Sequence, residues 1–130
     1  DIIQMTEFIS LLLITIIFVI LDVLWFSAWS LKAIYEPTFA AIQGSPLELR
    51  LAGGIIAWFL LAVGIKYIVV PDGNLYRTFF RGALLGLVIY GVYNGTNYAT
   101  FSKYPVSTAI ADTLWGTFAV GTVSAIAGMI

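Results

Sequence analysis

The chain has 130 residues, of which 61% are hydrophobic and 10% are charged, and its net charge is −1. A soluble domain is about half apolar and about a quarter charged, so this composition predicts an integral membrane protein with a single domain, residues 1–130. The charge balance provides no basic face for nucleic acid. Histidine and cysteine are absent, which removes the commonest metal ligand, thiolate chemistry and the usual acid–base catalyst. We therefore expect no enzyme activity, no metal and no cofactor.

Four apolar runs are long enough to cross a membrane as helices, which takes about 20 residues each. They cover approximately residues 8–29, 51–70, 82–101 and 106–130. Strict two-residue alternation is missing, so helices rather than barrel strands are expected, because lipid offers no hydrogen bonds to exposed backbone groups. The predicted fold is an all-α, multi-pass, integral membrane four-helix bundle, and the pattern does not specify which membrane.

The longest connection joins the first two runs. Its apolar residues recur at helical spacing: Leu31, Ile34, Tyr35, Phe39 and Ile42. This spacing suits either a short helix in the membrane interface or an irregular loop. Ser45 followed by Pro46 is typical of a helix start, and residues 71–74 have turn chemistry that ends the second run. The chain starts at Asp1 without methionine and ends in the apolar residues 127–130, so a processed or trimmed segment is expected. No signal peptide is expected, because the acidic start lacks a basic region.

Two aspartates lie inside the apolar runs, each three residues before a tryptophan. Asp22 precedes Trp25 in the first run, and Asp112 precedes Trp115 in the fourth. A carboxylate at membrane depth costs several kcal/mol, so each one is expected to face the bundle interior and to meet a partner there. The repeated Asp-x-Leu-Trp tetrapeptide also allows an internal repeat of the kind found in transporters.

The third run carries amides and hydroxyls that lipid cannot satisfy. Its polar residues lie on one face of the predicted helix or on a face that overlaps it. They are near the membrane surface at which the first run ends and the fourth run begins. At 1.5 Å per residue, these residues and both aspartates lie in one leaflet, roughly 10 Å from the surface. We therefore expect one polar intramembrane cluster: Asp22, Trp25, Tyr90, Asn94, Asn97, Thr100, Asp112 and Trp115.

This cluster has two interpretations. Amides and hydroxyls hydrogen-bond between helices and fix their register, each bond contributing about 1 kcal/mol. Alternatively, the buried acids change charge and form a site for a proton or a solute. Two acids without a basic partner tend to share a proton, and Lys103 is expected to face the headgroups instead.

Glycines of the third run are expected where helices cross closely, because only small residues let backbones approach. Gly82 and Gly86 form one small-xxx-small pair, and Gly91 and Gly95 form another. The third helix is therefore predicted to be the best packed, and Gly91→Leu is predicted to disrupt assembly.

Taken together, the motifs resemble a family of small predicted membrane proteins, known mainly from bacteria and catalogued as domain of unknown function 2177. The resemblance rests on Leu21-Asp22 with Trp25, on segment 82–100, and on Asp112 with Trp115-Gly116. The family implies four membrane helices and supplies no activity, substrate or cofactor. Asn94 stands where aspartate is common in the family, which removes a third acid and weakens a proton-relay hypothesis.

The favoured function is a non-catalytic accessory or structural subunit of a larger membrane assembly. Few residues lie outside the spans, and the glycine-rich and aromatic-rich faces suit contact with bound lipid, pigment or other subunits. The expected partners are membrane lipid and either other membrane-protein subunits or further copies of the chain. The alternative is a small oligomeric transporter or channel that uses the intramembrane residues Asp22 and Asp112.

Overall fold

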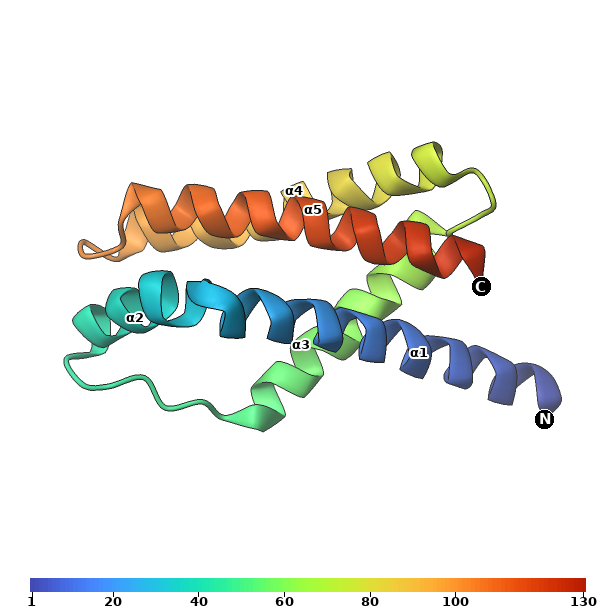
Figure 1. Ribbon diagram of the computed structural model, residues 1–130, viewed down its shortest axis with the longest axis horizontal. Helices are drawn as coiled ribbons and strands as arrows, with labels where there is room; N and C mark the ends of the chain where they lie inside the picture. Colours follow the sequence, from blue (N-terminus) through green and yellow to red (C-terminus); the bar gives the residue numbers. More distant parts are fainter.

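The computed structural model describes residues 1–130, and its regular elements are all helical. They are α1 (Ile2–Trp25), η1 (Phe26–Tyr35), α2 (Glu36–Gln43), α3 (Leu51–Gly64), η2 (Ile65–Val69), α4 (Leu75–Thr100) and α5 (Val106–Met129). Both chain ends and the turn before α4 lie at one end of the bundle, and α2 and the turn before α5 lie at the other (Figure 1). Four helical stretches are long and apolar enough to cross a membrane, so the predicted all-α, multi-pass membrane fold is confirmed.

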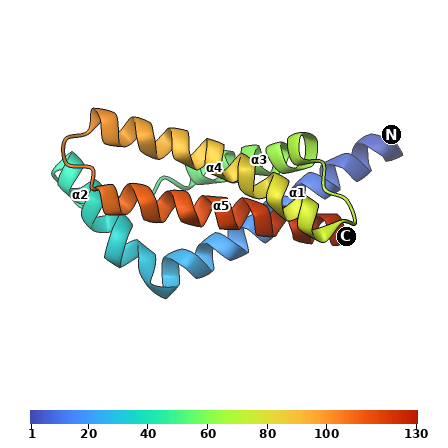
Figure 2. The ribbon, with the colours of Figure 1, turned by 90° about the horizontal axis from the view of Figure 1, so that it is seen from above.

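The first helix continues beyond the predicted end of the first span. It runs without a break from Ile2 to Gln43, a length of 42 residues, which would measure about 63 Å if straight. The segment η1 is π-helical, and the long helix bends sharply there (Figure 2), because π-helical turns interrupt the regular hydrogen-bond ladder. The bend brings α2 to the start of α5, where the hydroxyls of Thr38 and Thr108 lie 2.8 Å apart.

Between the first two spans, α2 is therefore an extension of the first helix and not a separate one. It ends at Gly44, whose φ of 74° lies in the left-handed region that favours glycine. The predicted helix start at Ser45 is wrong, because α3 begins only at Leu51. The side-chain amide of Gln43 donates to the carbonyls of Ser45 and Pro46, which ties this stretch to the end of α2.

Helices α4 and α5 approach closely at the first glycine pair of α4. A Cβ on Gly82 would collide with the side chain of Ser124 and the carbonyl of Val120. A Cβ on Gly86 would collide with the backbone of Gly116. Small residues on both helices therefore allow the two backbones to come together, as predicted for this pair.

The second glycine pair of α4 reaches no close helix crossing within the chain. A Cβ on Gly91 would meet only the Thr113 methyl group, at 3.9 Å, and a Cβ on Gly95 would meet nothing within 4 Å. Gly95 is exposed, whereas Gly91 is half-buried and borders α5 only at ordinary van der Waals distance. The most enclosed helix is α5 and not α4, since nine residues of α5 are buried against four of α4.

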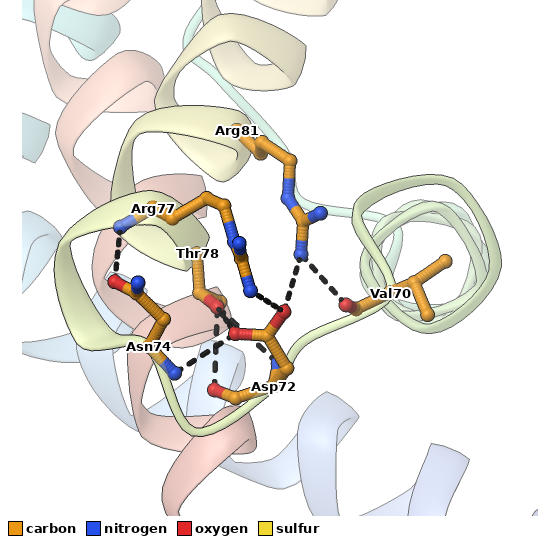
Figure 3. Close-up of polar contacts among 6 residues, drawn as sticks. All are labelled: Val70, Asp72, Asn74, Arg77, Thr78 and Arg81. Carbon is orange, nitrogen blue, oxygen red and sulfur yellow. Dashed lines mark hydrogen bonds and ion pairs between the residues drawn. The ribbon is translucent and has the colours of Figure 1, made fainter.

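Asp72 holds the turn between η2 and α4 (Figure 3). Its carboxylate accepts hydrogen bonds from the backbone N–H of Asn74 at 2.9 Å and from the guanidinium groups of Arg77 at 2.9 Å and Arg81 at 3.3 Å. The hydrogen bond from Asn74 and the neighbouring Arg77 lower the pKa of Asp72 from 3.8 to about 2. Arg81 also donates to the carbonyl of Val70. The turn, which was predicted from its residue types, is therefore also stabilised by ion pairs between Asp72 and the two arginines.

The apolar core lies where α1, α3, η2 and α5 meet. Its buried members are Leu11, Ile14, Phe18, Ala62, Ile65, Ala119, Val120 and Val123. On α1 the buried face continues from Ile14 and Phe18 to Asp22, at four-residue spacing. The core therefore ends directly against a carboxylate.

Candidate functional site

Asp22 joins three helices. The residue is only 5% exposed. Its Oδ2 accepts the indole N–H of Trp58 on α3 at 2.7 Å, and its Oδ1 accepts that of Trp115 on α5 at 2.8 Å. Both carboxylate oxygens are thus occupied by indole donors from two different helices.

Asp112 is the centre of a second set of hydrogen bonds and is 7% exposed. Its Oδ1 accepts the hydroxyl of Tyr35 at 2.6 Å, and its Oδ2 accepts the side-chain N–H of Asn94 at 2.6 Å. The carbonyl oxygen of the Asn94 side chain in turn accepts the hydroxyl of Tyr104 at 2.6 Å. The same amide N–H group also donates to the backbone carbonyl of Tyr90, so Asn94 is fixed in orientation.

The two tryptophans of the repeated motif connect these sets. The rings of Trp25 and Trp115 stack with centroids 4.5 Å apart. Trp115 donates to Asp22, and Trp25 donates to the hydroxyl of Tyr35 at 3.2 Å, which bonds Asp112. Each tryptophan is therefore linked to the aspartate of the other motif. Trp115 binds Asp22 directly, and Trp25 is linked to Asp112 through Tyr35.

The structure brings most of the predicted cluster into this network, and it places three of the predicted residues elsewhere. Tyr90 contributes its carbonyl, while its ring packs against Gly116. Asn97 is half-buried, and Tyr104 donates to Asn94 rather than to it. Thr100 is exposed, and its hydroxyl turns back to a carbonyl of its own helix.

Three members of the network were not predicted to belong to it: Tyr35, Trp58 and Tyr104. Tyrosine and tryptophan are common at the ends of membrane helices, where they anchor in the interface, so their presence alone gave no signal. These residues could have been predicted by comparing the number of buried hydrogen-bond donors with the number of buried acceptors. Two buried carboxylates and an amide need several donors, and buried tyrosine and tryptophan side chains need acceptors.

One protein-family model, described as "Predicted membrane protein (DUF2177)", matches residues 7–130. The chain belongs to DUF2177. Searches of curated proteins and of solved structures found no match. The matched range contains both aspartates, both tryptophans of the repeated motif and every other member of the network.

Neither aspartate of this DUF2177 protein has a cationic partner. The ion pairs of the structure join Lys66 to Glu7 and two arginines to Asp72. The four groups that donate to the buried carboxylates are two indoles, a phenol and an amide, all neutral. No group of three or more aspartate or glutamate side chains comes together in the structure.

An open cleft of about 340 Å³ lies beside the Asp112 set, between η1, α2 and the start of α5. Ile34 and Thr38 line one wall, and Thr108 and Ala111 line the other. Lys103, from the turn before α5, also contributes to its lining and is exposed. The hydrogen bond between the two threonines joins the walls.

Proposed function

We propose that this DUF2177 protein is a non-catalytic accessory subunit of a larger membrane assembly, and that it docks through the outer side of α4 against a transmembrane helix of another subunit. The observation that carries the proposal is a row of small residues at four-residue spacing, Gly91, Gly95 and Ala99. Gly95 and Ala99 are exposed, and a Cβ on Gly95 would touch nothing within 4 Å. A partner helix has room to approach the backbone closely here.

The contrast within α4 supports this proposal. Gly82 and Gly86 lie against α5, where a Cβ would collide with the neighbouring helix. Gly91 and Gly95 have the same spacing and no such neighbour inside the chain. Glycine inside a helix lowers stability by roughly 0.5–1 kcal/mol relative to alanine. Contact with lipid alone does not offset this loss. Contact with another helix can offset it, because small residues permit close packing of helices in membranes.

Polar groups beside the row also favour a protein partner over lipid. Asn97 is partly exposed near the end of α4, where its side-chain amide lies beside the hydroxyl of Tyr104. Tyr93 and Tyr98 are 50% and 55% exposed on the same half of the helix. An amide at this depth needs hydrogen-bond partners that hydrocarbon does not supply.

Purification from the native membrane in mild detergent tests the proposal. The parent chain should co-migrate with a complex of several different proteins, and Gly95→Leu should release it. Gly53→Leu is the matched control, because Gly53 is also an exposed helical glycine whose Cβ would meet nothing within 4 Å. It should stay in the complex. Thermal unfolding of each purified chain checks that neither change alters the fold.

Two results would contradict the proposal. One is retention of Gly95→Leu in the complex at the level of the control. The other is migration as an oligomer of this chain alone, with proton or cation flux in liposomes that Asp112→Asn abolishes. That second result would support a small transporter that uses Asp22 and Asp112.

A further inference from the structure

We propose that the cleft between η1, α2 and the start of α5 binds the phosphate headgroup of an anionic membrane phospholipid. The proposal is independent of the docking surface on α4. It rests on the position of the cleft in the membrane, on the hydrogen-bond donors of its lining, and on its charge.

The cleft lies at the level of the lipid headgroups. The membrane-spanning part of α5 begins at Val106, and Lys103 and Pro105, which line the cleft, precede that residue in the turn. Ala111, the lining residue furthest along α5, lies only about 8 Å beyond Val106. The same end of the bundle carries α2 (Figure 1). The cleft therefore extends from the membrane surface to the depth of the lipid glycerol groups.

The first turn of α5 has hydrogen-bond donors that the chain does not use. Pro105 precedes the helix and provides no side-chain cap. The backbone N–H groups of Val106, Ser107 and Thr108 have no acceptor within the chain. Ser107 and Thr108 line the cleft, so this turn borders it directly. A helix start attracts anions, because its free N–H groups carry positive partial charge.

A buried pair of threonines supplies a second, independent donor. Thr38 and Thr108 both line the cleft, and each is only 4% exposed. Their hydroxyls share one hydrogen bond of 2.8 Å, although together they carry two hydrogens. The hydroxyls of Thr15 and Thr117 donate to the carbonyl four residues back, whereas those of the buried pair bond only each other. One hydroxyl hydrogen in the cleft therefore needs an acceptor from outside the chain.

The charge of the cleft favours an anion. Lys103 is the only charged residue of the lining, and it takes part in none of the ion pairs of the structure. Glu36 is the acid nearest to the lining in the sequence, and it is exposed and lines a different hollow, between α2 and the stretch that follows it. An ammonium group together with N–H and hydroxyl donors suits the oxygens of a phosphate.

The walls and the size of the cleft favour a lipid as the source of that phosphate. The rest of the lining is apolar: Ala33, Ile34, Pro37, Ala41, Pro105 and Ala111. Its volume of about 340 Å³ is at the lower end of the roughly 300–1,000 Å³ typical of small-molecule sites, which suits a headgroup without its acyl chains. The chains would lie on the adjoining membrane-facing surface, where Val106 and Ile110 are 50% and 56% exposed. Basic pockets between membrane helices bind anionic lipid headgroups in this way.

Native mass spectrometry of the intact chain in mild detergent tests the binding. The chain should retain phosphatidylglycerol, which is anionic, in preference to phosphatidylcholine, which has no net charge. Lys103→Gln should weaken phosphatidylglycerol binding about fivefold, the effect of one lysine near an anionic lipid. Lys32→Gln is the matched control, because Lys32 is an exposed lysine of η1 without an ion pair and outside the lining. Equal effects of the two changes, or no preference for phosphatidylglycerol, would overturn the proposal.

Two uncharged changes test the cleft itself. Ala33→Leu should obstruct the cleft and lower phosphatidylglycerol binding, whereas Ala28→Leu, at an exposed position of η1 outside the lining, should not. Thermal unfolding checks that both variants keep the fold. Binding that Lys103→Gln weakens but Ala33→Leu leaves unchanged would mean attraction to the surface in place of a site, and would contradict the proposal.

Competition with inorganic phosphate distinguishes a lipid from a free anion. A large excess of inorganic phosphate should leave phosphatidylglycerol bound, because the free anion gains nothing from the apolar walls or the adjoining membrane-facing surface. Displacement of the lipid by inorganic phosphate would show that the cleft binds a free anion, and the assignment to a lipid would be wrong.

Discussion

Trp25 and Trp115 stack nearly parallel across the contact between α1 and α5, with ring centroids 4.5 Å and ring planes 4° apart. Each tryptophan follows one aspartate in the sequence and is hydrogen-bonded, directly or through a tyrosine, to the other aspartate in the structure. Trp115 donates to Asp22, and Trp25 reaches Asp112 through the hydroxyl of Tyr35. The stack thus joins the two buried carboxylates into one network.

Trp115→Phe should destabilise the chain by about 1–3 kcal/mol, because it leaves one buried oxygen of Asp22 without its donor while an aromatic ring remains in the stack. Trp29→Phe is the control, since Trp29 is 51% exposed and lies edge-on to Trp25. It should change stability much less. Thermal unfolding in detergent measures both. Equal effects would show that ring packing, and not the hydrogen bond to Asp22, is what Trp115 contributes.

The two glycine pairs of α4 should respond in opposite ways to alanine. Gly86→Ala places a methyl group against the backbone of Gly116, and such overpacking costs about 1–3 kcal/mol. Gly95→Ala meets open space and should stabilise the isolated chain by roughly 0.4–1 kcal/mol, because alanine reduces the freedom of the unfolded chain. Thermal unfolding of the two variants side by side decides the matter. A similar loss in both would place Gly95 inside a contact that the structure lacks.

Much of this site could be predicted from the sequence because burying a charge in a membrane is so unfavourable. That cost indicates that Asp22, Asp112 and Asn94 face inward, and residue counting places them at one depth. It does not indicate which donors they meet. Depth along a helix follows from residue counting, whereas the pairing of helix faces depends on crossing angles that single helices do not encode.

The differences between expectation and structure have the same origin. Gly82/Gly86 and Gly91/Gly95 are identical as motifs, and only the position of α5 separates a packed pair from an open one. The π-helical segment η1 was not predicted either, because no proline or glycine marks it. Ser30 is buried within it and bonds the carbonyl of Trp25, five residues back, which gives a local reason for the wider turn.

Asp72 should make stability depend on pH in the acid range. Its pKa is lowered from 3.8 to about 2 in the folded chain, first by the backbone hydrogen bond from Asn74 and then by Arg77. A group with a lowered folded pKa contributes stability above its unfolded pKa and loses it as the pH falls. The difference in thermal midpoint between the parent and Asp72→Asn should therefore be constant near neutral pH and shrink as the pH falls from 3.8 to about 2. A difference that does not change over this range would contradict the role of the Asp72 charge.

The most direct test of the central claim, that one interior network of neutral donors holds both aspartates and joins the helices, is thermal unfolding of Asp112→Asn beside Asp112→Leu. The amide matches the carboxyl in shape and can keep both hydrogen bonds, with its N–H group toward Tyr35 and its carbonyl toward Asn94, so the cost should be at most about 1 kcal/mol. Leucine leaves Tyr35 and Asn94 without their acceptor in a low-dielectric interior, which should cost about 1–3 kcal/mol for each stranded group. A leucine variant as stable as the parent, or an asparagine variant as damaged as the leucine one, would contradict the account.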